Sequence, residues 1–127
     1  MSEVVLITGG SSGIGKAVAE YLHNKGYIVY GTSRNPDKVK EALPFKLVAL
    51  DVGNVDTIQS AVNEIIAKEG RLDILINNAG VGITGPLEET PDEEIKKAFQ
   101  TNVFGPIDVI KAVLPQMRKQ QSGLIIN

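Results

Sequence analysis

Short apolar runs alternate with segments of helical periodicity along this chain, and that alternation limits the possible folds more than any single motif does. The apolar runs are Val4–Ile7, 27–30, 47–50, Ile74–Ile76 and Leu124–Ile126, and the helical segments cover about 14–25, 36–43, 55–69 and 91–119. Nearly continuous apolar strands joined by helices are typical of a parallel sheet with helices on both faces. The sequence therefore predicts an α/β fold built on a doubly wound parallel sheet.

A glycine-rich loop follows the first apolar run. Residues 8–15 read TGGSSGIG, and the apolar residues after them recur at helical spacing. At a helix N-terminus, unpaired N–H groups and peptide dipoles attract anions, and glycine lets a phosphate approach because it has no Cβ. Ser11 and Ser12 add hydroxyl donors to the same loop. We therefore interpret the loop as a candidate diphosphate site.

Other interpretations of this loop stay open on its own residues. Residues 10–16 satisfy the pattern GxxxxGK, and the run LVALD at 47–51 imitates the strand and aspartate that accompany a P-loop. A P-loop needs Ser or Thr after the lysine to hold magnesium, and Ala17 stands there, so an NTPase is disfavoured. The glycine spacing also departs from the GxGxxG dinucleotide pattern. A plain flexible turn is the third interpretation.

The composition is that of a single globular domain. The 127 residues are 43% apolar and 22% charged, which is enough to build a core. A formal net charge of −2 gives no reason to expect nucleic acid or a membrane surface as a partner, and no apolar run approaches a membrane span. There is no cysteine for disulfides or thiolate metal sites, and His23 falls on the polar side of the first predicted helix. We expect a cytoplasmic protein without a metal site.

A second motif follows the fourth apolar run, where residues 77–80 read NNAG. Together with TGGSSGIG and the segment around Asn102, it makes the chain resemble the short-chain dehydrogenase/reductase family from Val4 to Asn127. The resemblance implies a Rossmann-type sheet of strand order 3-2-1-4-5, truncated after the fifth strand, so that residues 1–127 form an incomplete NAD(P)-binding domain. It also implies reversible carbonyl/alcohol hydride transfer on a small molecule by a homodimer or homotetramer.

The same resemblance assigns the cofactor-binding residues. The loop residues that would hold the cofactor diphosphate are Thr8, Gly9, Ser11, Ser12, Gly13, Ile14 and Gly15. The residues that would contact the adenine and its ribose are Asp51, Val52, Asn78, Ala79 and Gly80. Asn77 has a second interpretation as a strand-end cap.

The end of the second strand bears on the choice of cofactor. An NAD enzyme usually places an acid there to bind the ribose 2′-hydroxyl. Here Ser33 occupies that position, and Arg34 can form a charge-assisted contact with a 2′-phosphate. NADP(H) is therefore favoured over NAD(H). The alternative is that Arg34 only solvates the loop.

Asn102 falls on the apolar stripe of the predicted helix 91–119, so we expect a buried amide with hydrogen-bond partners. Pro106 has no N–H to donate to the Asn102 carbonyl, and Gly105 eases a local distortion. The resemblance implies that Asn102 is catalytic and that its carbonyl holds a water of a proton relay. A simple packing kink is the alternative.

The family chemistry also needs a serine and a Tyr-x-x-x-Lys pair, which the resemblance places beyond Asn127. Tyr21 and Lys25 have the required spacing, but they lie on the first predicted helix, where a packing residue and a helix-end cation are expected. We therefore expect the N-terminal half of a longer reductase, inactive by itself. A non-catalytic dinucleotide-binding module is the alternative.

A truncated sheet should leave part of one face bare. With the predicted strand order, the first two helices cover one face and the next two cover the other. Later helices would cover strands four and five, so we expect Ile74, Ile76, Leu124 or Ile126 to face solvent.

Overall fold

A computed structural model describes residues 2–127 and shows a parallel sheet of 5 strands in the order β3-β2-β1-β4-β5. The predicted fold class and strand order are confirmed. In chain order the elements are β1 (Val4–Ile7), α1 (Gly13–Asn24), β2 (Ile28–Ser33), the 3-10 turn η1 (Pro36–Lys38), β3 (Lys46–Ala49), α2 (Val55–Glu69), β4 (Ile74–Ile76), η2 (Leu87–Glu89), α3 (Asp92–Phe99), η3 (Gln100–Phe104), α4 (Gly105–Gln120) and β5 (Leu124–Ile126).

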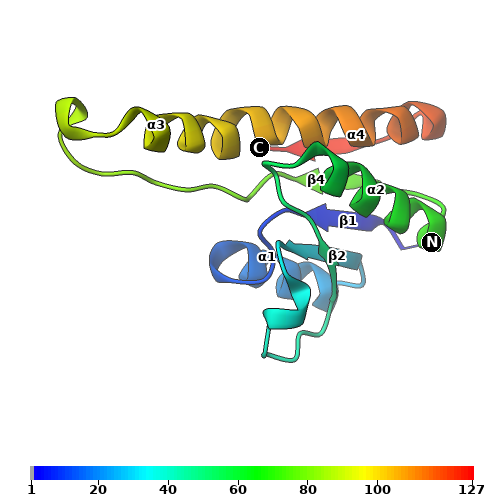
Figure 1. The fold of residues 1–127 in the computed structure, drawn as a ribbon. Helices are drawn as coiled ribbons and strands as arrows, with labels where there is room; N and C mark the ends of the chain where they lie inside the picture. The colour runs from blue at the N-terminus through cyan, green and yellow to red at the C-terminus, as the bar shows by residue number, and fades with distance from the viewer. Residues whose placement is uncertain (1) are drawn as a thin grey trace.

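Helices cover both faces of the sheet, and β1 runs through its middle (Figure 1). Val4 and Leu6 pack into one core cluster with residues of α2 and α4, whereas Val5 and Ile7 pack into a second cluster with α1. A strand that is buried on both faces must be apolar at every position. This is why β1 shows no alternation of apolar and polar residues.

The segment after β2 differs from the prediction of a helix over 36–43. Only the single 3-10 turn η1 forms there. Leu43 packs against the α1 side of the core, and the following Pro44 disfavours helical geometry at Leu43. A segment this short gains too few helical hydrogen bonds to resist those two effects.

The strand β2 continues past its apolar run 27–30 and ends at Ser33, the position that the sequence analysis assigned to the strand end. Gly31 pairs with Ile7 of β1, and Ser33 pairs with Ala49 of β3. Glycine and hydroxyl residues interrupt the apolar pattern, but their backbones continue the ladder. The carboxyl end of β2 therefore lies at Ser33, beside the ends of β1 and β3.

The predicted helix 91–119 is interrupted by the π-helical turn η3 between α3 and α4. The Gly105 N–H donates to the Gln100 carbonyl, five positions back instead of four. A Cβ on Gly105 would lie 2.8 Å from the Cβ of Val52, so the helix can approach the end of β3 only with glycine at this place. The predicted distortion at Gly105 and Pro106 is confirmed. In Figure 1, α3 and the segment before it project beyond the sheet.

The expected bare face exists at β5 but not throughout β4. Leu124 and Ile126 are 52% and 44% exposed. Leu124 and Ile126 are thus the exposed residues among the four candidates, whereas Ile74 is only 9% exposed. Ile74 packs into the same cluster as Val5 and Ile7, beneath α1, and Ile76 is half-buried there.

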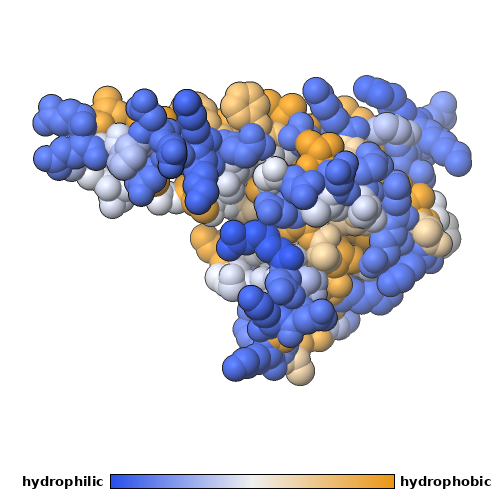
Figure 2. Space-filling model, in the orientation of Figure 1, coloured by the Kyte–Doolittle hydropathy of each residue, from blue (hydrophilic) through white to orange (hydrophobic). Residues whose placement is uncertain are grey.

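A second group of exposed apolar residues lies on the helical rod that α3, η3 and α4 form together over residues 92–120, called the α3–α4 rod below. Figure 2 shows apolar surface between charged residues along this upper edge of the molecule. The large exposed apolar residues of the rod are Phe99, Val103, Phe104 and Ile107.

None of the helices in residues 2–127 has the length and apolar composition needed to cross a bilayer.

Asp73 joins the amino ends of β1 and β4. Its buried carboxylate accepts the Val4 N–H at 2.8 Å and two Arg71 hydrogen bonds at 2.7 and 2.6 Å. Burial by itself would raise the pKa of Asp73, but these donors outweigh it and hold the pKa below its usual value.

Candidate functional site

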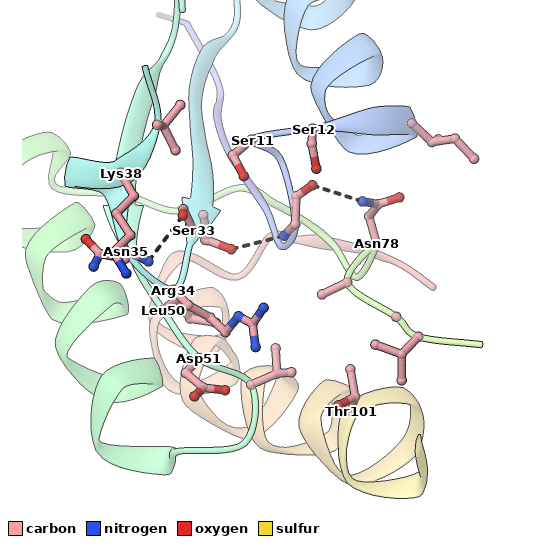
Figure 3. Close-up of a pocket in the computed structure, with 18 residues that line it drawn as sticks. Ser11, Ser12, Ser33, Arg34, Asn35, Lys38, Leu50, Asp51, Asn78 and Thr101 are labelled. Atoms are coloured by element: carbon pink, nitrogen blue, oxygen red, sulfur yellow. Dashed lines mark hydrogen bonds between the residues drawn. The ribbon is translucent and has the colours of Figure 1, made fainter. Parts of the chain in front are cut away.

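A cavity of about 910 Å³ opens at the carboxyl ends of the strands, which is where doubly wound sheets bind their ligands. Figure 3 shows residues that follow different strands converging on it. They are Gly9, Ser11, Ser12 and Ile14 after β1, Thr32 to Asn35 with Lys38 and Val39 at the end of β2, Leu50 to Val52 after β3, Asn78 to Val81 after β4, and Thr101.

Thr8 connects the glycine loop to the end of β4. It is 1% exposed, and its hydroxyl oxygen accepts the N–H groups of Asn78 and Ala79, both at 3.0 Å. Its own N–H donates to the Ile76 carbonyl at 3.1 Å. Thr8 does not line the cavity, so it sets the position of the two segments that do.

The loop lies directly on the backbone of β2. The Gly9 N–H donates to the buried Thr32 hydroxyl at 3.0 Å, and Gly9 has a positive φ of 68°. A Cβ on Gly10 would lie 2.8 Å from the Gly31 Cα. Glycine at position 10 therefore allows the loop and β2 to pack main chain against main chain. A Cβ on Gly9 would instead meet the segment after β4, 3.2 Å from the Ala79 Cα.

Gly15 has a packing role as well. A Cβ at this position would lie 2.4 Å from both the Gly9 carbonyl oxygen and the Asn78 amide nitrogen. Gly15 is buried and does not line the cavity. Gly13 is not in the lining either, and its φ of 57° lies in the left-handed region. These two glycines shape the loop behind the residues that face the cavity.

The N-terminus of α1 fits an anion. Ser12 is the N-cap residue, but its side chain makes no capping hydrogen bond, so its hydroxyl is left for a ligand. Ser11, Ser12 and Ile14 line the cavity next to the first N–H groups of the helix. The absent Cβ atoms and the uncapped helix end match the requirements of a diphosphate.

The ends of β2 and β3 supply the charged residues of the cavity. Ser33 accepts the Asn35 N–H at 3.2 Å, and Arg34 extends into the cavity below the glycine loop (Figure 3). At the end of β3, one carboxylate oxygen of Asp51 accepts the Gly53 N–H at 2.9 Å. Its other oxygen makes no hydrogen bond within residues 2–127, so it can accept from a ligand.

Thr57 at the start of α2 holds the backbone of Asp51 in place. The Asp51 N–H donates to the Thr57 hydroxyl at 2.9 Å, and that hydroxyl lies 2.9 Å from the Asp51 carbonyl oxygen. The next residue, Val52, packs against Gly105 and lines the cavity. The two predicted adenine-contacting residues therefore lie on a well-supported turn.

Asn77 and Asn78 have different partners. The Asn78 amide donates to the Gly9 carbonyl at 3.3 Å, and Asn78, Ala79 and Gly80 line the cavity. The Asn77 amide donates to Asn127 at 2.9 Å, and the Asn77 N–H donates to the Ile126 carbonyl at 2.8 Å. Asn77 thus joins the ends of β4 and β5, away from this cavity.

Asn102 is exposed, so the prediction of a buried amide was wrong. The π-turn and the projection of α3 beyond the sheet carry it to the surface. Its amide still finds partners, because Oδ1 accepts the Val81 N–H at 2.8 Å and Nδ2 donates to the Val81 carbonyl at 2.7 Å. Asn102 and Pro106 line a smaller cavity of about 360 Å³ with Asn77 and Asn127.

The sequence model of the family described as "short chain dehydrogenase" matches residues 3–127. This chain belongs to the short-chain dehydrogenase family. It is 47% identical over 125 residues to a 3-ketodihydrosphingosine reductase of Bacteroides thetaiotaomicron, a match that covers 98% of this chain and 46% of the relative.

Solved structures agree with this membership. A short-chain dehydrogenase from Streptomyces avermitilis superposes with a TM-score of 0.91 at 38% identity, covering 98% of this chain and 48% of that one. A structure described as ElxO with NADP bound has a TM-score of 0.90 at 36% identity and covers 98% and 54% of the two chains. The chain spans about half the length of the relatives that it matches.

Most of the predicted site residues of this family member surround one cavity, but sequence reasoning missed several lining residues. They are Thr32, Asn35, Lys38, Val39, Leu50, Val81 and Thr101. Lys38 and Val39 were missed because a helix was predicted over 36–43. Thr101 was missed because the predicted helix over 91–119 drew attention only to Asn102 as a site residue. The assignment of Ser33 to the end of β2 was a signal that could have found Thr32 and Asn35, since these residues flank that strand end.

The Tyr21 and Lys25 pair lies outside this cavity. Tyr21 is 61% exposed, so it is not the packing residue that the helical stripe predicted. The Lys25 amino group lies 5.4 Å from the centre of the Tyr21 ring, a surface cation–π contact.

Proposed function

We propose that this chain is the cofactor-binding half of an NAD(P)-dependent oxidoreductase that interconverts carbonyls and alcohols. The observation that carries the proposal is the cavity at the carboxyl ends of the strands, where an uncapped helix N-terminus meets a loop with no room for a Cβ at Gly10 or Gly15. Membership of the short-chain dehydrogenase family and similarity to a chain described with NADP support it. When bound, the nicotinamide supplies or accepts the hydride.

In this proposal each edge of the cavity holds one part of the dinucleotide. Ser11, Ser12 and the N–H groups at the start of α1 bind the diphosphate. The free carboxylate oxygen of Asp51 accepts from the adenine, and Val52 packs against its ring. Asn78 to Gly80 flank the adenine ribose, at a place set by the Thr8 hydroxyl.

We also propose that NADP(H) is preferred over NAD(H). Ser33 places no negative charge at the end of β2, and its hydroxyl can donate to a phosphate oxygen while its oxygen accepts the Asn35 N–H. Arg34 lines the same part of the cavity and can bind the 2′-phosphate through two parallel hydrogen bonds.

The catalytic residues are proposed to include Asn102 together with residues that this chain does not contain. Pro106 cannot donate to the Asn102 carbonyl, so that oxygen can hold a water of the proton relay. We place the serine and the Tyr-x-x-x-Lys pair outside residues 1–127. Two observations support this: the relatives are about twice as long as the chain, and the apolar residues of β5 are exposed. Phe99, Val103 and Ile107 on the α3–α4 rod support a homodimer or homotetramer.

Calorimetric titration of the complete gene product that contains this chain tests the proposal. We expect saturable binding of NADP⁺ and no magnesium-dependent binding of ATP, whereas binding of Mg-ATP alone would overturn the dinucleotide assignment. NADPH oxidation is then followed with a panel of ketones, including the ketone named for the Bacteroides relative. Tight NADPH binding without turnover of any ketone favours the non-catalytic module.

A further inference from the structure

A second cation lines the cavity at the end of β2, and sequence reasoning did not single it out. Lys38 lies four positions after Arg34, on the 3-10 turn η1, and both side chains line the cavity. Figure 3 shows Lys38 extending from this turn alongside Asn35, close to the segment that follows β2. Both cations therefore line the cavity from the segment that follows β2, Arg34 directly after the strand and Lys38 on η1.

Three hydrogen bonds donated by backbone N–H groups fix the position of the Lys38 backbone relative to the end of β2. The Asn35 N–H donates to the Ser33 hydroxyl at 3.2 Å, the Lys38 N–H donates to the Asn35 carbonyl at 3.1 Å, and the Val39 N–H donates to the Pro36 carbonyl at 3.1 Å. Pro36 restricts φ at the first position of the turn. The base of the Lys38 side chain is thus placed by the same turn that places Ser33.

Neither cation is neutralised by the fold. Within residues 2–127, the side chains of Arg34 and Lys38 make no ion pair and no hydrogen bond, whereas Lys16, Lys46 and Arg71 are paired with carboxylates. The only acidic residue in the described lining is Asp51, and one of its oxygens is occupied by the Gly53 N–H. This end of the cavity therefore holds an excess of positive charge.

A phosphate monoester carries a charge of about −1.5 to −2 at neutral pH, which a single guanidinium does not balance. Arginine binds two phosphate oxygens in a plane, and a lysine ammonium adds a point charge from another direction. We infer that Lys38 is a second specificity-determining residue, which binds the 2′-phosphate of NADP(H) together with Arg34; this inference rests on the proposed dinucleotide-binding function. The unmodified 2′-hydroxyl of NAD(H) gains nothing from Lys38.

The test compares Lys38→Ala with Lys40→Ala in the complete gene product. Lys40 is also an exposed lysine, two positions further along, but it does not line the cavity. We expect Lys38→Ala to weaken NADP⁺ binding roughly five- to tenfold and to leave NAD⁺ binding unchanged, as for the loss of one charge-assisted contact. Lys40→Ala should change neither affinity, and Lys38→Arg should retain most of the NADP⁺ affinity.

The double variant Arg34→Ala/Lys38→Ala should bring the affinities for NADP⁺ and NAD⁺ close together. The wild-type preference should also weaken as salt rises, because screening acts on both exposed cations. If Lys38→Ala behaves like Lys40→Ala while Arg34→Ala weakens NADP⁺ binding, the inference on Lys38 is wrong and the proposed function stands. Equal losses for both dinucleotides would also overturn it, and failure of the wild type to bind either one would overturn the proposed function itself.

Discussion

Thr8→Val removes one hydroxyl that holds the glycine loop against the end of β4. The Thr8 oxygen accepts from the N–H groups of Asn78 and Ala79, both at 3.0 Å, and valine fills nearly the same volume without an acceptor. A buried donor left without a partner costs about 1–3 kcal/mol. Because Asn78 and Ala79 are half-buried, the lower part of that range applies to each. We expect the free energy of unfolding to fall by about 2–3 kcal/mol in total.

Thr8→Ser is the matched control, because it keeps the hydroxyl and loses only a buried methyl group, which costs about 1 kcal/mol. Urea unfolding of both variants, followed by circular dichroism, measures the difference. NADP⁺ titration should show a larger loss of affinity for Thr8→Val, since the loop is no longer held against β4. If Thr8→Val is as stable as Thr8→Ser and binds as well, the hydroxyl does not position the loop.

Gly15→Ala should lower the free energy of unfolding by more than about 2 kcal/mol, since its Cβ would lie 2.4 Å from the Gly9 carbonyl oxygen. A variant with the same urea midpoint and NADP⁺ affinity as the wild type would contradict this. The lowered pKa of Asp73, which results from its bonds to Arg71 and Val4 despite burial, predicts an acid-labile contribution to stability. That contribution is complete above the unfolded pKa of about 3.9 and is lost as pH falls through the folded pKa. The stability gap between wild type and Asp73→Asn should therefore shrink below about pH 4, and a gap independent of pH would refute it. Asn102→Leu removes both bonds to Val81 and should lower turnover of the complete enzyme more than it raises the dissociation constant of NADP⁺, measured by steady-state kinetics and calorimetry; a change in binding alone would exclude Asn102 from the catalytic residues.

Much of the site could be predicted because its residues directly follow strands. In a parallel sheet all carboxyl ends meet at one edge, so Gly9, Asp51 and Asn78 had to lie near one another once the strands were recognised. What each residue does there was harder to infer. Gly15 shows this best: the need for glycine comes from the Gly9 carbonyl oxygen and the Asn78 amide, which are neighbours only in the folded chain.

Errors arose where a local helical pattern was overruled by contacts that form only in the folded chain. The segment 36–43 has helical spacing, but Leu43 is drawn to the core and Pro44 ends any helix before it. Asn102 shares its helix face with apolar residues, yet the π-turn at Gln100–Phe104 and the close approach of Gly105 to Val52 carry it to the surface. The distortion at Gly105 and Pro106 was predicted, but the burial of Asn102 was inferred from the apolar periodicity of a regular helix, which does not hold across the π-turn.

The sequence by itself determined the parallel sheet, its helical connections and the glycine loop, because burial on both faces of a strand and the backbone freedom of glycine act on neighbouring residues. Only the tertiary structure decided which residues of the site contact one another. It brought Thr8 to Asn78, Asn102 to Val81 and Lys38 to the cavity that Arg34 lines. These pairings depend on how segments distant in the sequence approach each other. The excess positive charge of Arg34 and Lys38 near Ser33 follows from the turn η1 after β2, which the sequence did not predict.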